Sequence, residues 1–398
     1  MAVSGAGRLG DRSLFPDLAA RAYLNHAGAS PPSLPVLAAV RDYLAATARG
    51  GMEGHRAALQ LSTRLRERAA ELVGGAPADV ALTPGLSSGV QAVAIEYPWR
   101  PGDRVVLFEG EFPANVTPWQ QAAALHGLQP TMLPLAEWED GSGLGLARLE
   151  ETLRRGARLV AVSAVQFRTG YSMPLAEMAA LCDRHGAELF VDAIQACGAV
   201  PIDAPALGID YLATGAHKWL MGIHGAGFLW VKPGRAEALR PWLAGWLAHE
   251  DPVGFLTRGP GHLRYDRPIR REAAALEGSS SSTSSQAALL ASLELLLGLG
   301  VPAIRAHLGG WLDGAAAALA ARGFEVLRSP DPARRSGFFS ARPPPGVAAT
   351  RLRDGLAARG VAVAIPDGLL RIAPHWPNAP AEVPVLAAAL DEVLAERP

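Results

Sequence analysis

Cysteine is scarce in this chain of 398 residues, which contains only Cys182 and Cys197. Two cysteines cannot form a disulfide framework or a zinc site built from several thiolates. A charge of one sign is also missing, because 37 basic and 38 acidic residues leave a net charge of -1. This balance argues against a dedicated nucleic-acid or anionic-membrane binder, which would carry an excess of basic residues.

Long apolar runs and metal motifs are missing as well. The most apolar stretch, 286–300, is interrupted by Glu294 and followed by Pro302, and it is too short to cross a bilayer. The N-terminus shows no apolar signal core. The histidines form neither an H-E-x-x-H motif nor another convincing metal spacing. We therefore expect a cytoplasmic protein without a metal site.

Short apolar runs are abundant, and they predict the fold. Hydrophobic residues make up 49% of the chain, which is enough for a large core. Between 79 and 232, apolar runs alternate with amphipathic helical stretches. The predicted strands are 79–83, 104–109, 131–135, 158–165, 188–193, 211–215 and 227–232. Because these runs are apolar on both faces, we predict an α/β fold with a mostly parallel seven-stranded sheet covered by helices.

The chain is expected to divide into four segments. We predict an N-terminal arm over 1–24 and a large domain over 25–255. A loop or linker over 256–285 contains the serine-rich run at its end, and a smaller C-terminal α/β domain is predicted over 286–398. The length of the chain fits such a pair of domains.

One loop rich in glycine and serine, GLSSG at 85–89, follows a predicted strand and opens a predicted helix. Three interpretations fit this context. Ser87 could be the nucleophile of a hydrolase elbow. Ser87 and Ser88 could instead hold a phosphate at the N-terminus of the helix, where backbone N–H groups favour an anion. The loop could also be a plain turn with a serine cap, and the loop alone does not decide among them.

Polar side chains also follow two neighbouring strands of the predicted sheet. Asp192 and Gln195 come at the end of one strand, and His217 and Lys218 follow the next. Ligands of open α/β sheets bind at this carboxyl edge. Pyridoxal phosphate needs a lysine for a Schiff base, a carboxylate beside its ring nitrogen and a cradle for its phosphate. The combination therefore predicts a pyridoxal-phosphate site with Asp192 ionised and Lys218 deprotonated by burial near cations.

These motifs resemble the class V aminotransferase-like family of fold-type I pyridoxal-phosphate enzymes. That family includes cysteine desulfurases, selenocysteine lyases, kynureninases and isopenicillin N epimerase-like proteins. The resemblance runs from YLNHAGASPP at 23–32 to LLRIAPHWPN at 369–378, and its most specific part is the combination VDAIQ…HKW.

The resemblance implies a cofactor contact for each of a set of residues. These residues are Ser87, Ser88, Phe112, Asp192, Gln195, His217, Lys218 and Ser280. Lys218 would be the catalytic Schiff-base lysine, Asp192 would pair with the ring nitrogen, and Gln195 would contact the ring hydroxyl. Phe112 would stack on the ring. Ser87, Ser88 and His217 would hold the phosphate, and Ser280 would extend to the phosphate of a partner subunit.

The resemblance further implies a homodimer with the active site at the subunit interface and an amino acid or related amine as substrate. Asn25 and His26 would line the substrate side, and Arg371 would bind the substrate carboxylate, for which a planar guanidinium is well suited. Such an enzyme acts through an external aldimine, and we favour an aminotransferase. A C–S or C–C lyase and an epimerase of the same family stay open.

A persulfide-forming desulfurase is disfavoured, because residues 331–370 contain no cysteine. Two further alternatives are a serine hydrolase that uses Ser87 with Asp192 and His217, and a pyridoxal-phosphate-binding protein without turnover.

Overall fold

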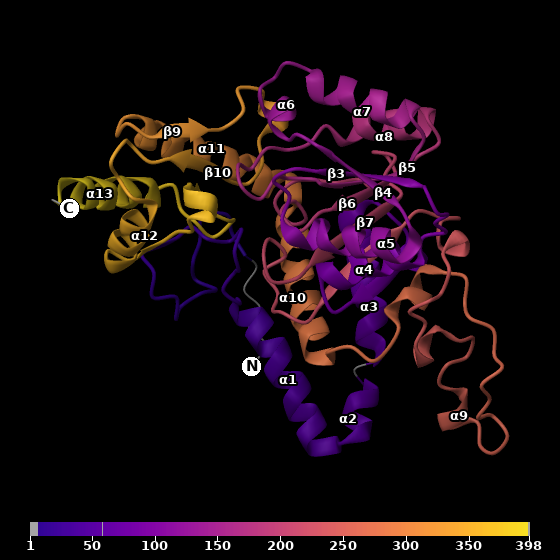
Figure 1. Ribbon diagram of the computed structural model, residues 1–398. Coiled ribbons are helices and arrows are strands. Elements are labelled where there is room, and N and C mark those ends of the chain that lie inside the picture. Colours follow the sequence, from indigo (N-terminus) through magenta and orange to yellow (C-terminus); the bar gives the residue numbers. More distant parts are fainter. Residues whose placement is uncertain (1–6, 58, 397–398) are drawn as a thin grey trace.

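A seven-stranded sheet forms the centre of the larger lobe in the computed structural model, which describes residues 7–57 and 59–396 (Figure 1). Its strands are β2 (Val80–Thr83), β3 (Arg104–Phe108), β4 (Gln129–Leu133), β5 (Ala157–Ser163), β6 (Glu188–Asp192), β7 (Tyr211–Gly215) and β8 (Gly227–Val231). They are ordered β2-β8-β7-β6-β5-β3-β4. Strand β8 runs antiparallel to both neighbours, whereas the other pairs are parallel.

Helices cover both faces of this sheet, as its apolar strands require. Helices α4 (Leu86–Glu96) and α5 (Thr117–His126) pack on one face, and α7 (Leu144–Arg154) and α8 (Leu175–Arg184) pack on the other. Successive residues of a strand such as β3 enter two separate apolar cores, one on each face. The predicted α/β fold with a mostly parallel seven-stranded sheet is confirmed, and each predicted strand lies within two residues of the observed bounds.

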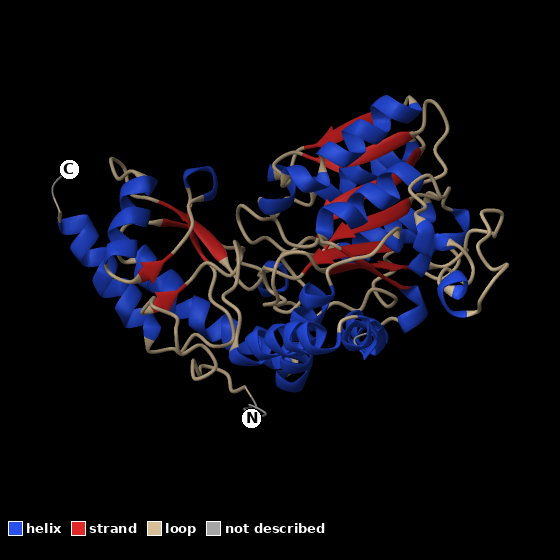
Figure 2. Cartoon of the chain, turned by 90° about the horizontal axis from the view of Figure 1, so that it is seen from below, coloured by secondary structure: helices blue, strands red, loops and turns tan. Residues whose placement is uncertain are grey.

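The smaller lobe is built mainly from the C-terminal part of the chain, coloured orange to yellow in Figure 1, and it lies beside the larger lobe in Figure 2. Its elements are β9 (Glu325–Leu327), β10 (Phe339–Arg342), β11 (Val361–Ala362), β12 (Leu370–Ile372), α11 (Val301–Ala320), α12 (Ala349–Ala358) and α13 (Glu382–Ala395). Strands β9, β10 and β12 form an antiparallel sheet with β10 in the middle. The predicted arm joins this lobe, because β1 (Ala22–Tyr23) pairs in parallel with β11.

A layer of helices connects the two lobes. Helix α10 (Thr283–Leu299) packs against α1 (Leu34–Gly50) and α3 (Leu59–Val73) of the larger lobe. The hydroxyl of Ser62 in α3 donates a hydrogen bond of 3.0 Å to Gln286 of α10. The domain limits stay a prediction, and these contacts favour a boundary after α10 rather than before residue 286.

Residues 283–320 form two helices rather than one, because the chain bends by 76° between α10 and α11. Gly300 lies at the bend with φ +79°, a backbone conformation that glycine adopts without strain. Among the described residues, no single helix is long and apolar enough to span a membrane. Helices α10 and α11 reach the length and apolar composition of a membrane span only when the bent pair is taken together.

The remaining elements are short. They are the helices α2 (Met52–Ala57), α6 (Ala136–Glu139) and α9 (Gly254–Thr257) and the 3-10 turns Pro77–Asp79, Pro113–Asn115, Ala236–Ala238, Trp246–Ala248, Ala273–Glu277, Pro332–Arg334 and Pro366–Gly368. The segment around α9 projects from the larger lobe (Figure 1).

Helix α10 should contribute to the stability of the larger lobe. Leu289 of α10 is fully buried in its core, so we expect Leu289→Ala to lower the free energy of unfolding by about 2–5 kcal/mol. Denaturant unfolding followed by circular dichroism measures this. Leu125→Ala on α5, where the leucine is 65% exposed, should change it by less than about 0.5 kcal/mol. Equal effects of the two substitutions would contradict the assignment of α10 to this core.

Candidate active site

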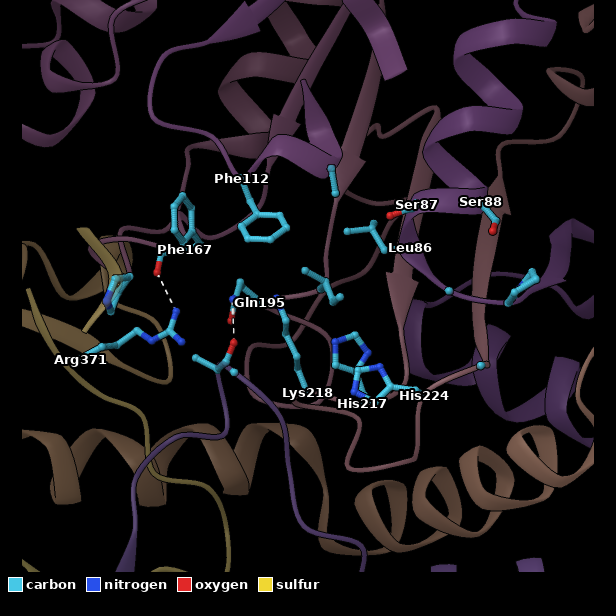
Figure 3. Close-up of a pocket in the computed structure, with 18 residues that line it drawn as sticks. Leu86, Ser87, Ser88, Phe112, Phe167, Gln195, His217, Lys218, His224 and Arg371 are labelled. Carbon is cyan, nitrogen blue, oxygen red and sulfur yellow. Dashed lines mark hydrogen bonds between the residues drawn. The ribbon is translucent and has the colours of Figure 1, made fainter. Parts of the chain in front are cut away.

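A cavity of about 510 Å³ lies at the carboxyl edge of the sheet, where the two lobes meet (Figure 3). Parallel strands end together at this edge, because Ser163 of β5 pairs with Asp192 of β6, which pairs with Ala213 of β7. Seven of the predicted site residues line the cavity. They are Ser87, Ser88, Phe112, Gln195, His217, Lys218 and Arg371.

Lys218 and Asp192 shift the pKa values of each other. Burial lowers the pKa of the Lys218 amine to about 8, Asp192 opposes that change, and Arg371 adds to it. Burial raises the pKa of Asp192 to about 7, and the nearby Glu111 adds to the rise, whereas the N–H of Ile194 and the Lys218 amine oppose it. An amine with a lowered pKa is deprotonated more readily, and a nucleophilic lysine needs this property.

Gln195 and Phe112 both lie near Lys218 in Figure 3. The amide nitrogen of Gln195 donates a hydrogen bond of 3.1 Å to the carbonyl of Ala27, and the amide oxygen accepts one of 2.7 Å from Trp219. The Phe112 ring centroid lies 5.3 Å from the Lys218 amine. A flat ring bound at Lys218 would therefore have an aromatic face and a fixed amide beside it.

The N-terminus of α4 carries the two predicted serines. Ser87 and Ser88 lie in the first turn of this helix, whose N–H groups and dipole favour an anion. Gly89 lets α4 approach the sheet, because a Cβ at this position would lie 3.0 Å from the Cβ of Ala213 in β7. The ring of His217 stacks on that of His224 at 4.0 Å, and burial lowers the pKa of His217 to about 4.

Arg371 comes from β12 of the smaller lobe and is 6% exposed. One guanidinium nitrogen donates a hydrogen bond of 3.1 Å to the carbonyl of Phe167, while its Nε is buried without a partner in the described part of the chain. Burial lowers its pKa to about 10. No acidic side chain among the described residues forms an ion pair with Arg371, so this guanidinium is suited to an anionic group of a ligand.

Asn25 also has an unsatisfied polar atom. Its backbone pairs with Ala373, two residues after Arg371, and its Oδ1 is buried without a hydrogen bond among the described residues. An orphaned acceptor of this kind is suited to a donor group of a ligand.

Four of the predicted residues do not line the cavity, namely Asn25, His26, Asp192 and Ser280. The His26 ring is 1% exposed and does not line the cavity, because its Nδ1 contacts Ser30 Oγ at 2.8 Å and its ring packs against His375. Ser280 is exposed and also lies outside the lining. Their predicted contacts with substrate and with a partner's phosphate stay predictions.

The structure adds cavity residues that the sequence reasoning missed. Phe167 and His224 line the cavity. Glu111, which is close enough to Asp192 to raise its pKa, accepts hydrogen bonds from Ser163 and Gln166. Phe167 follows a predicted strand by two residues, so the rule that ligands bind at carboxyl edges would have selected it. The sequence carried no comparable signal for His224.

A family model described as "Aminotransferase class-V" matches residues 22–365. The chain is 32% identical over 345 residues to isopenicillin N epimerase of Streptomyces clavuligerus, covering 83% of this chain and 84% of that protein. It is 29% identical over 391 residues to an uncharacterised aminotransferase of Bacillus subtilis, covering 97% of both. The chain therefore belongs to the class V aminotransferase family, as its motifs predict.

Solved structures show the same fold. A cysteine desulfurase from Escherichia coli has a TM-score of 0.84 at 24% identity and covers 96% of this chain and 97% of its own. A cystine C–S lyase in complex with cysteine persulfide has a TM-score of 0.86 at 23% identity and covers 96% and 100%. Membership in the class V family makes this chain a pyridoxal-phosphate-dependent enzyme, so the predicted enzyme class and cofactor are confirmed.

The charges around Lys218 predict the pH dependence of its reactivity. In the cofactor-free protein, acetylation of Lys218 by trace acetic anhydride should rise with a midpoint near pH 8, measured by mass spectrometry. Asp192→Asn should move the midpoint to lower pH, because Asp192 raises the pKa of the amine. Arg371→Gln should move it to higher pH, because the guanidinium lowers that pKa. The exposed Arg342→Gln is the control, and shifts of the opposite sign would contradict the described arrangement.

Proposed function

We propose that this protein is a pyridoxal-phosphate-dependent enzyme that acts on the amino group of an amino acid, and foremost an aminotransferase. The observation that carries the proposal is the placement of Lys218 and Arg371 in one cavity with Asp192 behind them. An amine and a guanidinium, neither in an ion pair with an acid among the described residues, suit an aldehyde cofactor and a substrate carboxylate respectively.

The cofactor, when bound, supplies an aldehyde for the amine and a ring that accepts electrons. Asp192 would hold a positive charge at the ring nitrogen, and Gln195 would contact the ring hydroxyl. Ser87 and Ser88 would hold the phosphate at the start of α4, together with His217. Arg371 would orient the substrate by its carboxylate, and Lys218 would move the proton at the substrate Cα as a general base.

An aminotransferase is favoured because the relative that matches 97% of this chain and 97% of its own length carries that name. An epimerase or a lyase of the same family is the alternative, since relatives and neighbours with those names share the fold. The three outcomes differ in where the proton removed from Cα is returned, or in whether a β-group leaves. All three require the Lys218, Asp192 and Arg371 set.

The two thiols argue against a persulfide-forming desulfurase. Cys182 and Cys197 are both buried, and neither lines the cavity. Burial raises the pKa of each thiol to about 12, whereas a sulfur acceptor must form a thiolate at an accessible position.

The geometry also disfavours a serine hydrolase. Among the described residues, no hydrogen bond joins Ser87 to His217 or His217 to Asp192. The His217 ring is stacked on His224, and Oδ1 of Asp192 accepts the backbone N–H of Ile194. Ser87, His217 and Asp192 are therefore not arranged as the nucleophile, base and orienting acid of a catalytic triad.

A homodimer in the cytoplasm completes the proposal. Large apolar side chains are exposed on α1 and on the segment that projects around α9 (Figure 1). They include Leu37, Leu44, Trp242, Leu256 and Tyr265. Exposed apolar groups of this number suit a subunit interface, and the neighbouring Ser280 would extend from it toward the partner's phosphate.

The Schiff base predicts a covalent label at one of only two lysines in the chain. The purified holoenzyme should have a visible absorption band that borohydride abolishes, with the pyridoxyl group mapped to Lys218 by mass spectrometry. Lys218→Ala should lose the covalent adduct. Lys232→Ala is the control, because Lys232 lies in an ion pair with Asp210 at 3.4 Å. Label at Lys232 would contradict the site, and a band that responds to no amino acid would indicate a binding protein without turnover.

The Arg371 guanidinium should determine affinity for the substrate carboxylate. Arg371→Gln should weaken binding of amino acids, measured from the spectral change on titration, by roughly 10- to 100-fold, which corresponds to a charge-assisted hydrogen-bonded pair. Cofactor affinity should change much less, since Arg371 lies at the substrate end. The control is Arg342→Gln, whose side chain is 61% exposed in an ion pair with Glu325. Equal binding by Arg371→Gln and wild type would contradict the assignment.

A further inference from the structure

Trp219, the residue after Lys218, contacts a residue of the candidate site without lining the cavity itself. Lys218 lines the cavity, whereas the Trp219 side chain is fully buried and does not. The indole N–H of Trp219 donates a hydrogen bond of 2.7 Å to Oε1 of Gln195, which does line the cavity. Any effect of this N–H on a bound ligand therefore passes through the Gln195 amide.

This hydrogen bond determines the orientation of the amide. An indole N–H can only donate, so the atom of Gln195 that faces it is the carbonyl oxygen. The amide nitrogen faces the opposite way, and one of its two N–H groups donates to the carbonyl of Ala27 at 3.1 Å. The amide of Gln195 is thus presented to the cavity as a donor. Without the indole N–H, the amide oxygen would be buried and unpaired, which is unfavourable and removes one of the two hydrogen bonds that favour this orientation.

The indole itself has little freedom to turn. Its ring stacks on Phe338 at 5.9 Å with an angle of 22° between the planes. The carbonyl of Trp219 accepts a hydrogen bond of 2.8 Å from His375 Nε2. A Cβ at Gly337 would lie 3.0 Å from the indole ring, so the backbone is packed directly against it. Contacts from the smaller lobe therefore hold the donor that orients Gln195.

The same stack connects to the substrate end of the cavity. The guanidinium of Arg371 lies 5.7 Å from the centre of the Phe338 ring, which stacks on Trp219. Trp219 thus contacts the Gln195 amide and also the Phe338 ring, which packs against the Arg371 guanidinium.

We propose that Trp219 is a positioning residue that holds the Gln195 amide with its N–H toward the hydroxyl of the cofactor ring. The proposal rests on the proposed function, since it requires the ring to lie beside Gln195. A donor stabilises the anionic form of the ring oxygen. The indole N–H therefore lowers the pH at which the visible band of the bound cofactor titrates.

The test is a pH titration of the visible band in the holoenzyme. Trp219→Phe removes the N–H and keeps an aromatic ring on Phe338, so the midpoint should rise by about 0.5–1 pH unit, the effect of losing one hydrogen bond. Trp230→Phe is the matched control. Trp230 is also fully buried, and its indole N–H has no partner among the described residues, so the midpoint should not move.

A double-mutant cycle shows whether the effect passes through the amide. In a Gln195→Leu background, Trp219→Phe should cause no additional shift, because the group that it orients is gone. The spectroscopic affinity for amino acids should stay within about two-fold of wild type in Trp219→Phe, since the stack under Arg371 persists. Should Trp219→Phe fail to fold, 3-benzothienylalanine at position 219 keeps the indole shape, lacks the N–H and should give the same shift.

Three results would overturn the proposal. One is equal midpoints in wild type and Trp219→Phe, and another is an equal shift in Trp230→Phe. The third is a shift that persists in the Gln195→Leu background. A wild-type protein without a visible band would instead contradict the proposed function, and this role with it.

Discussion

The burial of two opposite charges at one edge of a parallel sheet is the constraint on which the site depends. Asp192 and Lys218 come from the ends of neighbouring strands, where little water is available to solvate either group. Burial moves both pKa values toward neutrality, and the attraction between the groups opposes both changes. A ring that carries a positive nitrogen on one side and an electrophilic carbon on the other satisfies both groups at once. Ser87, Phe112, Gln195 and Arg371 line the same cavity as Lys218.

The cavity exists because the two lobes are packed closely together. Gly170, in the loop after β5, approaches the smaller lobe so closely that a Cβ would lie 2.3 Å from the carbonyl oxygen of Phe338. This contact brings β12, and with it Arg371, opposite the strand ends of the larger lobe. The proposed function would therefore place recognition of the substrate in one lobe and cofactor chemistry in the other. Relative motion of the lobes would change the distance between the Arg371 guanidinium and the Lys218 amine.

Family membership limits the reaction to pyridoxal-phosphate chemistry. The product that forms depends on the local geometry of the site. The same fold occurs in a cysteine desulfurase and in a cystine C–S lyase. What separates such enzymes is where protons and leaving groups are placed around Cα, and which side chains border that position. In this chain Phe112, Phe167 and Arg371 line the cavity, while both thiols are buried elsewhere.

Periodicity and residue type alone determined the seven strands, because the central strands had to be apolar on both faces to be buried. They also placed Asp192, Lys218 and Ser87 at one edge, since parallel strands end together. The tertiary structure decided the direction of β8, the bend at Gly300, the burial of His26 and the position of His224. It also decided the contact between Trp219 and Gln195. These features depend on packing between segments far apart in the chain, and local patterns carry no information about which distant surface a side chain will meet.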